Sequence, residues 1–240
     1  MCAPLLASCG QTGAATQATA TSPAAASAEA FGKAVNLRSS DLPNLTKTAP
    51  GGVVTPNAKE RLFARCLRSV NPSLRSATAI SPTFEELHGY VYIELSSEVV
   101  IYPTSKLARR AWYAGYADYQ PKATACYSQA AGLPRIKKGK NGYVFHNARP
   151  VVTAIADPIG GHSPFAGGRA TVAVVEYHRQ GKTERRVRSY NLYRDNLGLL
   201  DRDAIILLYV NTSAHVPPPA TERAALTTLL SRAEASAALL

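Results

Sequence analysis

Residues 170–179 read Ala-Thr-Val-Ala-Val-Val-Glu-Tyr-His-Arg, and Gln180-Gly181 separates this run from a second one, residues 182–194. The first run is rich in β-branched and aromatic residues, which favour strands. Gln180-Gly181 is typical of a tight hairpin turn. Residues 205–210 are uninterruptedly apolar, as in a strand at the centre of a sheet, and a further strand is expected over residues 148–156. The short connections between these strands predict an antiparallel meander.

The clearest predicted helix lies upstream of the meander, over residues 57–70. Its apolar side chains recur at helical spacing, whereas its basic side chains fall on the other faces. Asn57 is a suitable N-cap, and Asn71-Pro72 ends the pattern. The residues of the apolar face are Leu62, Phe63, Cys66, Leu67 and Val70.

Between this helix and the meander, the pattern predicts a hairpin followed by two helices. Residues 77–84 and 90–102 are the expected strands of the hairpin, with Pro82 interrupting the first. The pair Ser96-Ser97 indicates a bend or bulge in the second strand. Residues 104–116 predict a helix with Trp112 on its apolar face, and residues 122–131 predict a shorter helix that carries Cys126.

The two ends of the chain differ in character. Residues 10–30 are almost wholly Ala, Thr, Ser, Gln and Gly, which predicts a flexible tether, and residues 31–47 are interpreted as an extended lead-in. A last helix is expected from Thr221, after the spacer of three prolines at 217–219. We therefore expect a single α+β domain over residues 31–240. Its largely antiparallel sheet of about six strands would pack with an N-terminal helix, a central helical pair and a C-terminal helix.

The first residues contain the motif Leu6-Ala7-Ser8-Cys9, which resembles the bacterial lipobox. The resemblance implies that Cys9 is diacylated, and two acyl chains anchor a protein stably to a membrane. Only eight residues precede Cys9 and none is charged, so residues 1–9 are interpreted as a truncated lipoprotein signal segment whose true start lies upstream. The sequence contains no run of about 18 apolar residues, which is the length needed to span a bilayer. The expected location is the outer face of the cytoplasmic membrane, with the lipid anchor as the membrane contact.

Two cysteines remain in the expected domain, Cys66 and Cys126, and neither belongs to a C-x-x-C pair. An isolated pair in an exported domain favours one disulfide. The alternative is two buried thiols, because cysteine often serves as a small core residue.

The chain carries 27 basic and 16 acidic residues, a formal charge of +11, which favours anionic partners. Two basic clusters stand out, residues 135–140 and Arg185-Arg186-Val187-Arg188. They are either solvated surface charges or contacts to anionic head groups or wall polymers. No nucleic-acid partner is expected, because no recognition motif of the known kinds is present.

Catalytic chemistry finds little support in the sequence. Gly161-His162-Ser163-Pro164-Phe165 resembles the start of a nucleophile elbow, but Phe165 replaces the final glycine and Pro164 follows the serine. The histidines lack metal-ligand spacing, and no glycine-rich phosphate loop is present. No catalytic residue, metal or cofactor is therefore predicted.

Aromatic residues offer the one candidate ligand site. Tyrosines are dense around the long strand and the helix after it, and they could line a pocket for an apolar or glycan ligand. The alternative is that they close the edge of the core. The residues proposed for the ligand site are Tyr90, Tyr92, Trp112 and Tyr116.

The order of motifs resembles exported lipoproteins of actinobacteria and, more distantly, the extracellular sensor domains of some mycobacterial serine/threonine kinases. The matching motifs are residues 34–37 and 40–43, the Arg-rich helix with Cys66, residues 95–99, Cys126 after the Trp112 helix, and the Leu-rich C-terminal helix. The resemblance covers residues 31–233 and implies an exported, ligand-sensing domain without enzymatic activity.

Three functional hypotheses follow. The first is an envelope lipoprotein with a ligand-binding or sensor-like domain, whose ligand would be apolar or anionic. The second is a structural or interaction lipoprotein that contacts anionic wall polymer or a protein partner. The third is a hydrolase that uses His162 or Ser163.

Overall fold

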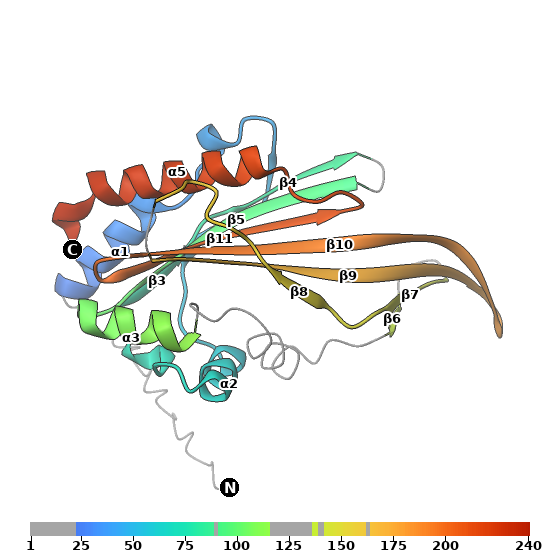
Figure 1. Ribbon diagram of the computed structural model, residues 1–240, viewed down its shortest axis with the longest axis horizontal. Coiled ribbons are helices and arrows are strands. Elements are labelled where there is room, and N and C mark those ends of the chain that lie inside the picture. The colour runs from blue at the N-terminus through green and yellow to red at the C-terminus, as the bar shows by residue number, and fades with distance from the viewer. Residues whose placement is uncertain (1–22, 89–90, 116–135, 139–141, 162–163) are drawn as a thin grey trace, which may run out of the picture.

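The computed structural model describes residues 23–88, 91–115, 136–138, 142–161 and 164–240. In this part of the chain, an 11-stranded antiparallel sheet carries helices on both faces (Figure 1). The predicted α+β class with a largely antiparallel sheet is confirmed. The sheet has more strands than the six or so expected, because several of its strands are too short to be recognised in the sequence.

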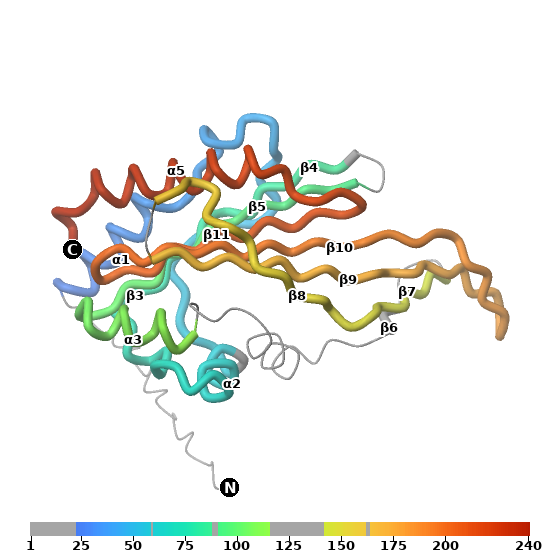
Figure 2. Tube along the Cα trace, viewed as in Figure 1, coloured from blue at the N-terminus to red at the C-terminus, as the bar shows by residue number. Residues whose placement is uncertain are grey.

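The predicted meander forms the longest part of the sheet. It consists of β9 (Phe165–Gln180), β10 (Thr183–Asp201) and β11 (Ala204–Ser213), with β8 (Val151–Ala154) added beside β9. The turn after Gln180 is confirmed, since Gly181 adopts a φ of 61° there. Strands β9 and β10 are longer than predicted and run past the helices as a two-stranded hairpin (Figure 2).

The predicted hairpin upstream is also present. Pro82 separates β3 (Ala77–Ile80) from β4 (Thr83–His88), and both pair with β5 (Val91–Ile101). β5 then pairs with β11, which joins the early strands to the meander. The bend or bulge predicted at Ser96-Ser97 is wrong, because the register with β11 runs through both residues without a shift.

Ser97 has a different role from the one expected. Its hydroxyl accepts a hydrogen bond from the Leu37 amide at 3.0 Å and donates one to Oδ1 of Asn36 at 2.9 Å. The polar residue in this buried strand therefore ties the segment after the first helix to the centre of the sheet.

Four short strands escaped the sequence analysis. β1 (Thr46–Ala49) pairs with β4, and β2 (Gly52–Val53) pairs with β3. β6 (Ile136–Lys138) pairs with β7 (Tyr143–Asn147), which in turn pairs with β9. Each is five residues or fewer, which is too short for an alternating pattern to stand out in its sequence.

The N-terminal boundary of the domain differs from the prediction. Residues 23–30, expected as tether, and residues 31–35, expected as extended, form helix α1 (Pro23–Val35), with a short 3-10 turn η1 (Ser39–Asp41) after it. Alanine has the highest helix propensity, and Ala28, Phe31 and Val35 are buried against the sheet. The helix lies so close to β3 that a Cβ on Gly32 would meet the Cβ of Ala79 at 2.6 Å.

Three further helices and two 3-10 turns complete the described structure. Asn57 caps α2 (Ala58–Leu67) as predicted, accepting the Glu60 amide at 3.0 Å, and the helix ends at Arg68, which has a φ of 57°. The predicted helix before Tyr116 is confirmed as α3, whereas the one at 122–131 lies outside the described residues. The remaining elements are η2 (Pro72–Leu74), α3 (Ser105–Gly115), α5 (Pro219–Ala235) and η3 (Ala237–Leu239).

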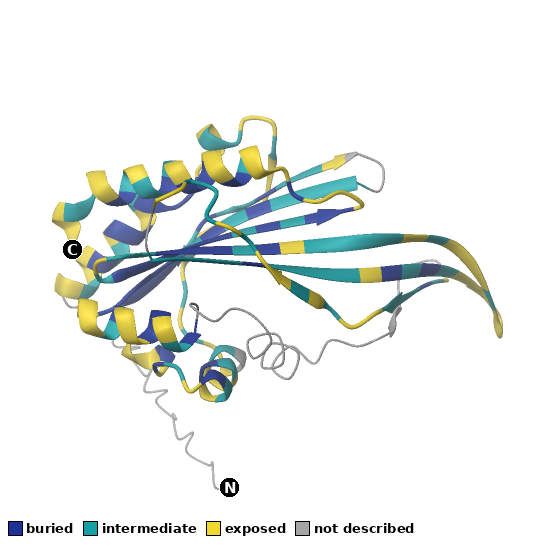
Figure 3. Ribbon diagram, in the orientation of Figure 1, coloured by how far each residue is buried: buried dark blue, intermediate teal, exposed yellow. Residues whose placement is uncertain are grey.

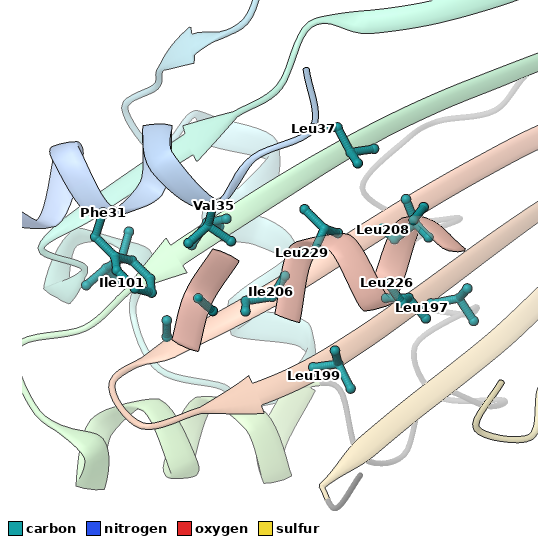
Figure 4. Close-up of a cluster of buried hydrophobic side chains, with 14 of the residues drawn as sticks. Phe31, Val35, Leu37, Ile101, Leu197, Leu199, Ile206, Leu208, Leu226 and Leu229 are labelled. Carbon is teal, nitrogen blue, oxygen red and sulfur yellow. The ribbon is translucent and has the colours of Figure 1, made fainter. Parts of the chain in front are cut away.

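Two hydrophobic clusters fix the helices to the sheet. On one face, α1 and α5 bury Phe31, Leu226 and Leu229 against Ile206 and Leu208 of β11 (Figure 4). On the other face, α3 buries Trp112 against β5 and β11. Burial therefore concentrates at the helical end, while the far end of the β9–β10 hairpin is largely exposed (Figure 3).

Candidate functional site

Of the four residues proposed for an aromatic ligand site, the structure describes Tyr92 and Trp112, which lie toward opposite ends of β5. Tyr92 is the second residue of β5 and is half-buried. Trp112 lies in α3, is 1% exposed, and packs in the cluster that contains Val100, near the other end of β5. Tyr90, Tyr116, Cys9 and Cys126 lie outside the described residues. The aromatic site and the pairing of Cys66 with Cys126 both stay predictions.

A pocket of about 520 Å³ opens instead on the α2 side of the sheet. Its walls come from the segment around β2, the first turn of α2, the end of β3 and the middle of β5. The volume lies within the usual range for small-molecule sites. The lining residues are Val53, Val54, Thr55, Asn57, Glu60, Ile80 and Glu98.

Alternation along β5 places Glu98 in this pocket. Leu95, Ser97 and Val99 point toward α1 and α5, so Glu98 projects from the opposite face, next to Ile80 of β3. The hydroxyl of Tyr209, from β11, donates to Oε2 of Glu98 at 2.9 Å. Burial raises the pKa of Glu98, and the Arg75 guanidinium partly offsets that increase.

Arg75 connects the pocket wall to α2. Its Nη1 donates to Oε2 of Glu60 at 2.8 Å and to the hydroxyl of Thr78 at 3.4 Å. The Arg75 side chain is only 12% exposed, whereas Glu60 is 32% exposed. The charged groups thus form a fixed wall, in which Glu60 and Glu98 present acceptor oxygens and the β2 segment presents apolar surface.

Polar side chains continue along this sheet face beyond the pocket. Asn211 of β11 donates to Oε1 of Glu94 at 2.5 Å and accepts from Nε of Arg194 at 2.9 Å. Burial raises the pKa of Tyr92, and the Glu94 carboxylate raises it further. Tyr92 therefore lies on the same face of the sheet as Glu94 and Glu98.

A second group of acids lies on the opposite face, beneath α5. Arg169 of β9 holds Asp195 of β10 with two hydrogen bonds, at 2.8 and 2.5 Å. Glu222, in the first turn of α5, shares a hydrogen bond with Asp195 and has a pKa raised to about 8, chiefly by burial. Asp195 and Glu222 are 0% and 1% exposed, so the pair lies inside the core beneath α5.

Other chemistry gains no support from the described residues. His162 and Ser163 lie outside them. No group of three or more His, Cys, Asp or Glu side chains in the described ranges could hold a metal ion. Within the same ranges, no helix combines the length and hydropathy that crossing a bilayer requires.

Glu60, Arg75 and Glu98 are not among the site residues predicted from the sequence. Only Glu98 stands out in the sequence, because it is an acidic residue within a predicted strand and its own neighbours in the chain are apolar or small. Such a residue indicates a special environment, because a buried carboxyl group needs hydrogen-bond partners. Glu60 and Arg75 carry no comparable signal, since a charge on a helix or in a loop is ordinary.

No protein-family model and no curated protein matches this chain. Among solved structures, it is distantly similar to the extracellular domain of PknH from Mycobacterium tuberculosis, with 11% identity, 86% of this chain and 96% of that chain covered, and a TM-score of 0.35. It is also distantly similar to LpqN, involved in cell envelope biogenesis of Mycobacterium tuberculosis, with 10% identity, 79% and 78% covered, and a TM-score of 0.23. At these scores, neither likeness bears on what this chain binds.

Proposed function

We propose that this chain is a non-enzymatic, extracytoplasmic binding domain that takes a small ligand in the pocket between α2 and β5. The pocket itself is the observation that carries the proposal. It is large enough for a ligand, and Arg75 and Tyr209 hold its two carboxyl groups in place. A preformed wall lowers the cost of ordering side chains when a ligand binds.

The lining favours one chemical class of ligand. Carboxyl oxygens of Glu60 and Glu98 accept hydrogen bonds, while Val53 and Ile80 offer apolar contact. A ligand with hydroxyl or ammonium groups beside an apolar portion satisfies both, because it supplies donors to the acceptors. An anionic ligand would find few hydrogen-bond donors at this wall, because Arg75 is already paired with Glu60.

Filling the pocket tests this function. We expect native mass spectra of the full chain, isolated from its envelope fraction, to show a small-molecule adduct that denaturation removes. Ile80→Trp should lower the occupancy of the adduct at least about fivefold, because the larger side chain takes up pocket volume. Val151→Trp, at a 64% exposed position on β8, is the control and should leave occupancy unchanged. An adduct that survives Ile80→Trp, or none in the unaltered chain, contradicts the proposal.

The location rests on Cys9. We propose that it is lipidated and that residues 10–22 link the anchor to α1. With the natural upstream sequence, the chain should incorporate labelled palmitate and fractionate with membranes. Cys9→Ala should abolish both, because one thioether carries the diacyl group. Cys2→Ala provides the matched control and should behave like the unaltered chain. Unlabelled, cytosolic wild-type protein would rule the anchor out.

A further inference from the structure

The outer part of the β9–β10 hairpin stands apart from the helical body. We call residues 136–138, 142–147 and 174–190 the distal ribbon; they comprise β6, β7 and the far halves of β9 and β10. No described helix covers this part of the sheet (Figures 1 and 2). Its turn residues, 180–183, are all exposed.

Basic residues dominate the distal ribbon. It has seven basic residues and only two acidic ones, so it supplies a large share of the net charge of +11. The acidic residues are Glu176 and Glu184, and the basic residues are Lys137, Lys138, Arg179, Lys182, Arg185, Arg186 and Arg188. A concentration of one sign at the end of a protrusion attracts partners of the opposite sign.

The two acidic residues already form ion pairs with basic residues of the ribbon. Glu184 pairs with Arg179 and lies 3.2 Å from Nε2 of His146, and Glu176 pairs with Arg188. In the described part of the chain, no carboxylate pairs with Lys182, Arg185 or Arg186, although Arg186 donates to the Ser189 hydroxyl at 2.7 Å. These three cations at the tip are available to an external anion.

The cations lie on both faces of the ribbon. Arg185 is opposite His178 and Arg186 is opposite Tyr177 in the register of β9 and β10. Neighbouring residues of a strand point to opposite faces, so Arg185 and Arg186 project in opposite directions. An elongated, flexible partner can contact both faces at once, whereas a flat surface laid along the ribbon reaches one.

The small number of exposed apolar side chains on the ribbon favours a polymer over a lipid bilayer as its partner. Segments that insert into membranes present Trp, Phe or Leu among their basic residues. Among residues 142–147 and 174–190, the one exposed large hydrophobic side chain is Val187, and the turn, Gln180-Gly181-Lys182-Thr183, has none. Arginine forks, in contrast, match phosphate and carboxylate groups geometrically.

We infer that the distal ribbon is a docking surface for a linear anionic polymer with repeated phosphate or carboxylate groups. Lys182, Arg185 and Arg186 make the principal contacts, and the ion pairs of Glu176 and Glu184 hold Arg188 and Arg179 in place. The surface is separate from the pocket between α2 and β5, so a polymer on the ribbon and a ligand in the pocket bind independently.

Binding of fluorescently labelled inorganic polyphosphate to the full chain tests the inference. Arg185→Glu with Arg186→Glu should raise the Kd at least about tenfold, because attraction becomes repulsion at the contact. The matched control is Arg109→Glu with Arg110→Glu on α3, two exposed positions with the same charge change, which should raise the Kd less than about threefold. Raising salt from about 50 to about 200 mM should weaken wild-type binding roughly tenfold.

Three results would overturn the inference. Equal losses in the two double variants would show that only net charge matters. If the unaltered chain does not bind polyphosphate at low salt, an anionic polymer is not the partner of the ribbon. Ribbon-dependent binding to phosphatidylglycerol vesicles, without binding to polyphosphate, would assign the surface to a bilayer instead. Thermal unfolding of both variants establishes that the exposed substitutions leave the fold intact.

Discussion

Replacing Glu222 with glutamine is expected to raise the free energy of unfolding at pH 7 by about 3 kcal/mol. In the folded chain, the pKa of Glu222 is raised from its ordinary value of 4.5 to about 8, so the carboxyl group keeps a proton that it would lose in the unfolded chain. A glutamine amide at this position donates to Asp195 without taking up a proton. The substitution therefore keeps the hydrogen bond and removes the cost of protonation.

The same shift makes the stability of the wild type depend on pH. Between about pH 4.5 and about pH 8, the folded state binds more protons at Glu222 than the unfolded state, so stability falls as pH rises. The contribution is fully present below the unfolded pKa and is lost as pH passes the folded pKa. The Glu222→Gln variant should lack this dependence.

Urea unfolding at pH 5, 7 and 9 measures both effects. Glu234→Gln, at an exposed position on the same helix, is the matched control and should change stability by less than about 0.5 kcal/mol. The account of Asp195 and Glu222 would be wrong if the Glu222→Gln substitution destabilised the protein at pH 7. It would also be wrong if the wild type and the Glu222→Gln variant had the same pH dependence.

Trp112→Ala is expected to lower the free energy of unfolding by about 3–5 kcal/mol. The indole is 1% exposed and packs with Val100, Ile205 and Leu207. A Cβ on Gly198 would come within 3.1 Å of its ring, so the sheet is shaped around this side chain. Truncation leaves a cavity that the rigid strands of the sheet do not close.

Tyr113→Ala is the control for Trp112→Ala, because the Tyr113 side chain is 62% exposed. Its removal should lower the free energy of unfolding by less than about 1 kcal/mol. Trp112 is the only tryptophan in the chain, so its fluorescence reports directly on the core. The wild type should emit as a buried indole and shift to the red during unfolding. A cost near zero for Trp112→Ala, or emission typical of a wet indole, would contradict the core assignment.

The parts of the fold that the sequence predicts are those with a strong local signal. The turn after Gln180, the cap at Asn57 and the break at Pro82 all follow from the chemistry of those residues. Helix α1 was missed because its sequence is low in complexity, and its helix is stabilised by the distant strand β3. Tertiary packing determines whether such a segment is helical, and the composition of the segment alone does not reveal that packing.

The candidate site was less predictable than the fold. Glu60, Arg75 and Glu98 are far apart in the sequence and meet only where the first turn of α2 and the residue after η2 come beside the end of β3 and β5. Tyr92 and Trp112 are close in the sequence, but β5 and the turn into α3 carry them to different regions. Sequence proximity was therefore a poor guide to which side chains share a pocket.

The packing of α1 on α5 has a consequence for the order of folding. Phe31 and Val35, near the start of the described chain, share one core with Leu226, Leu229 and Ala233 near its end. Contacts between such distant residues slow folding, because a long loop must close before they form. During synthesis, this core therefore stays incomplete until the last helix has emerged.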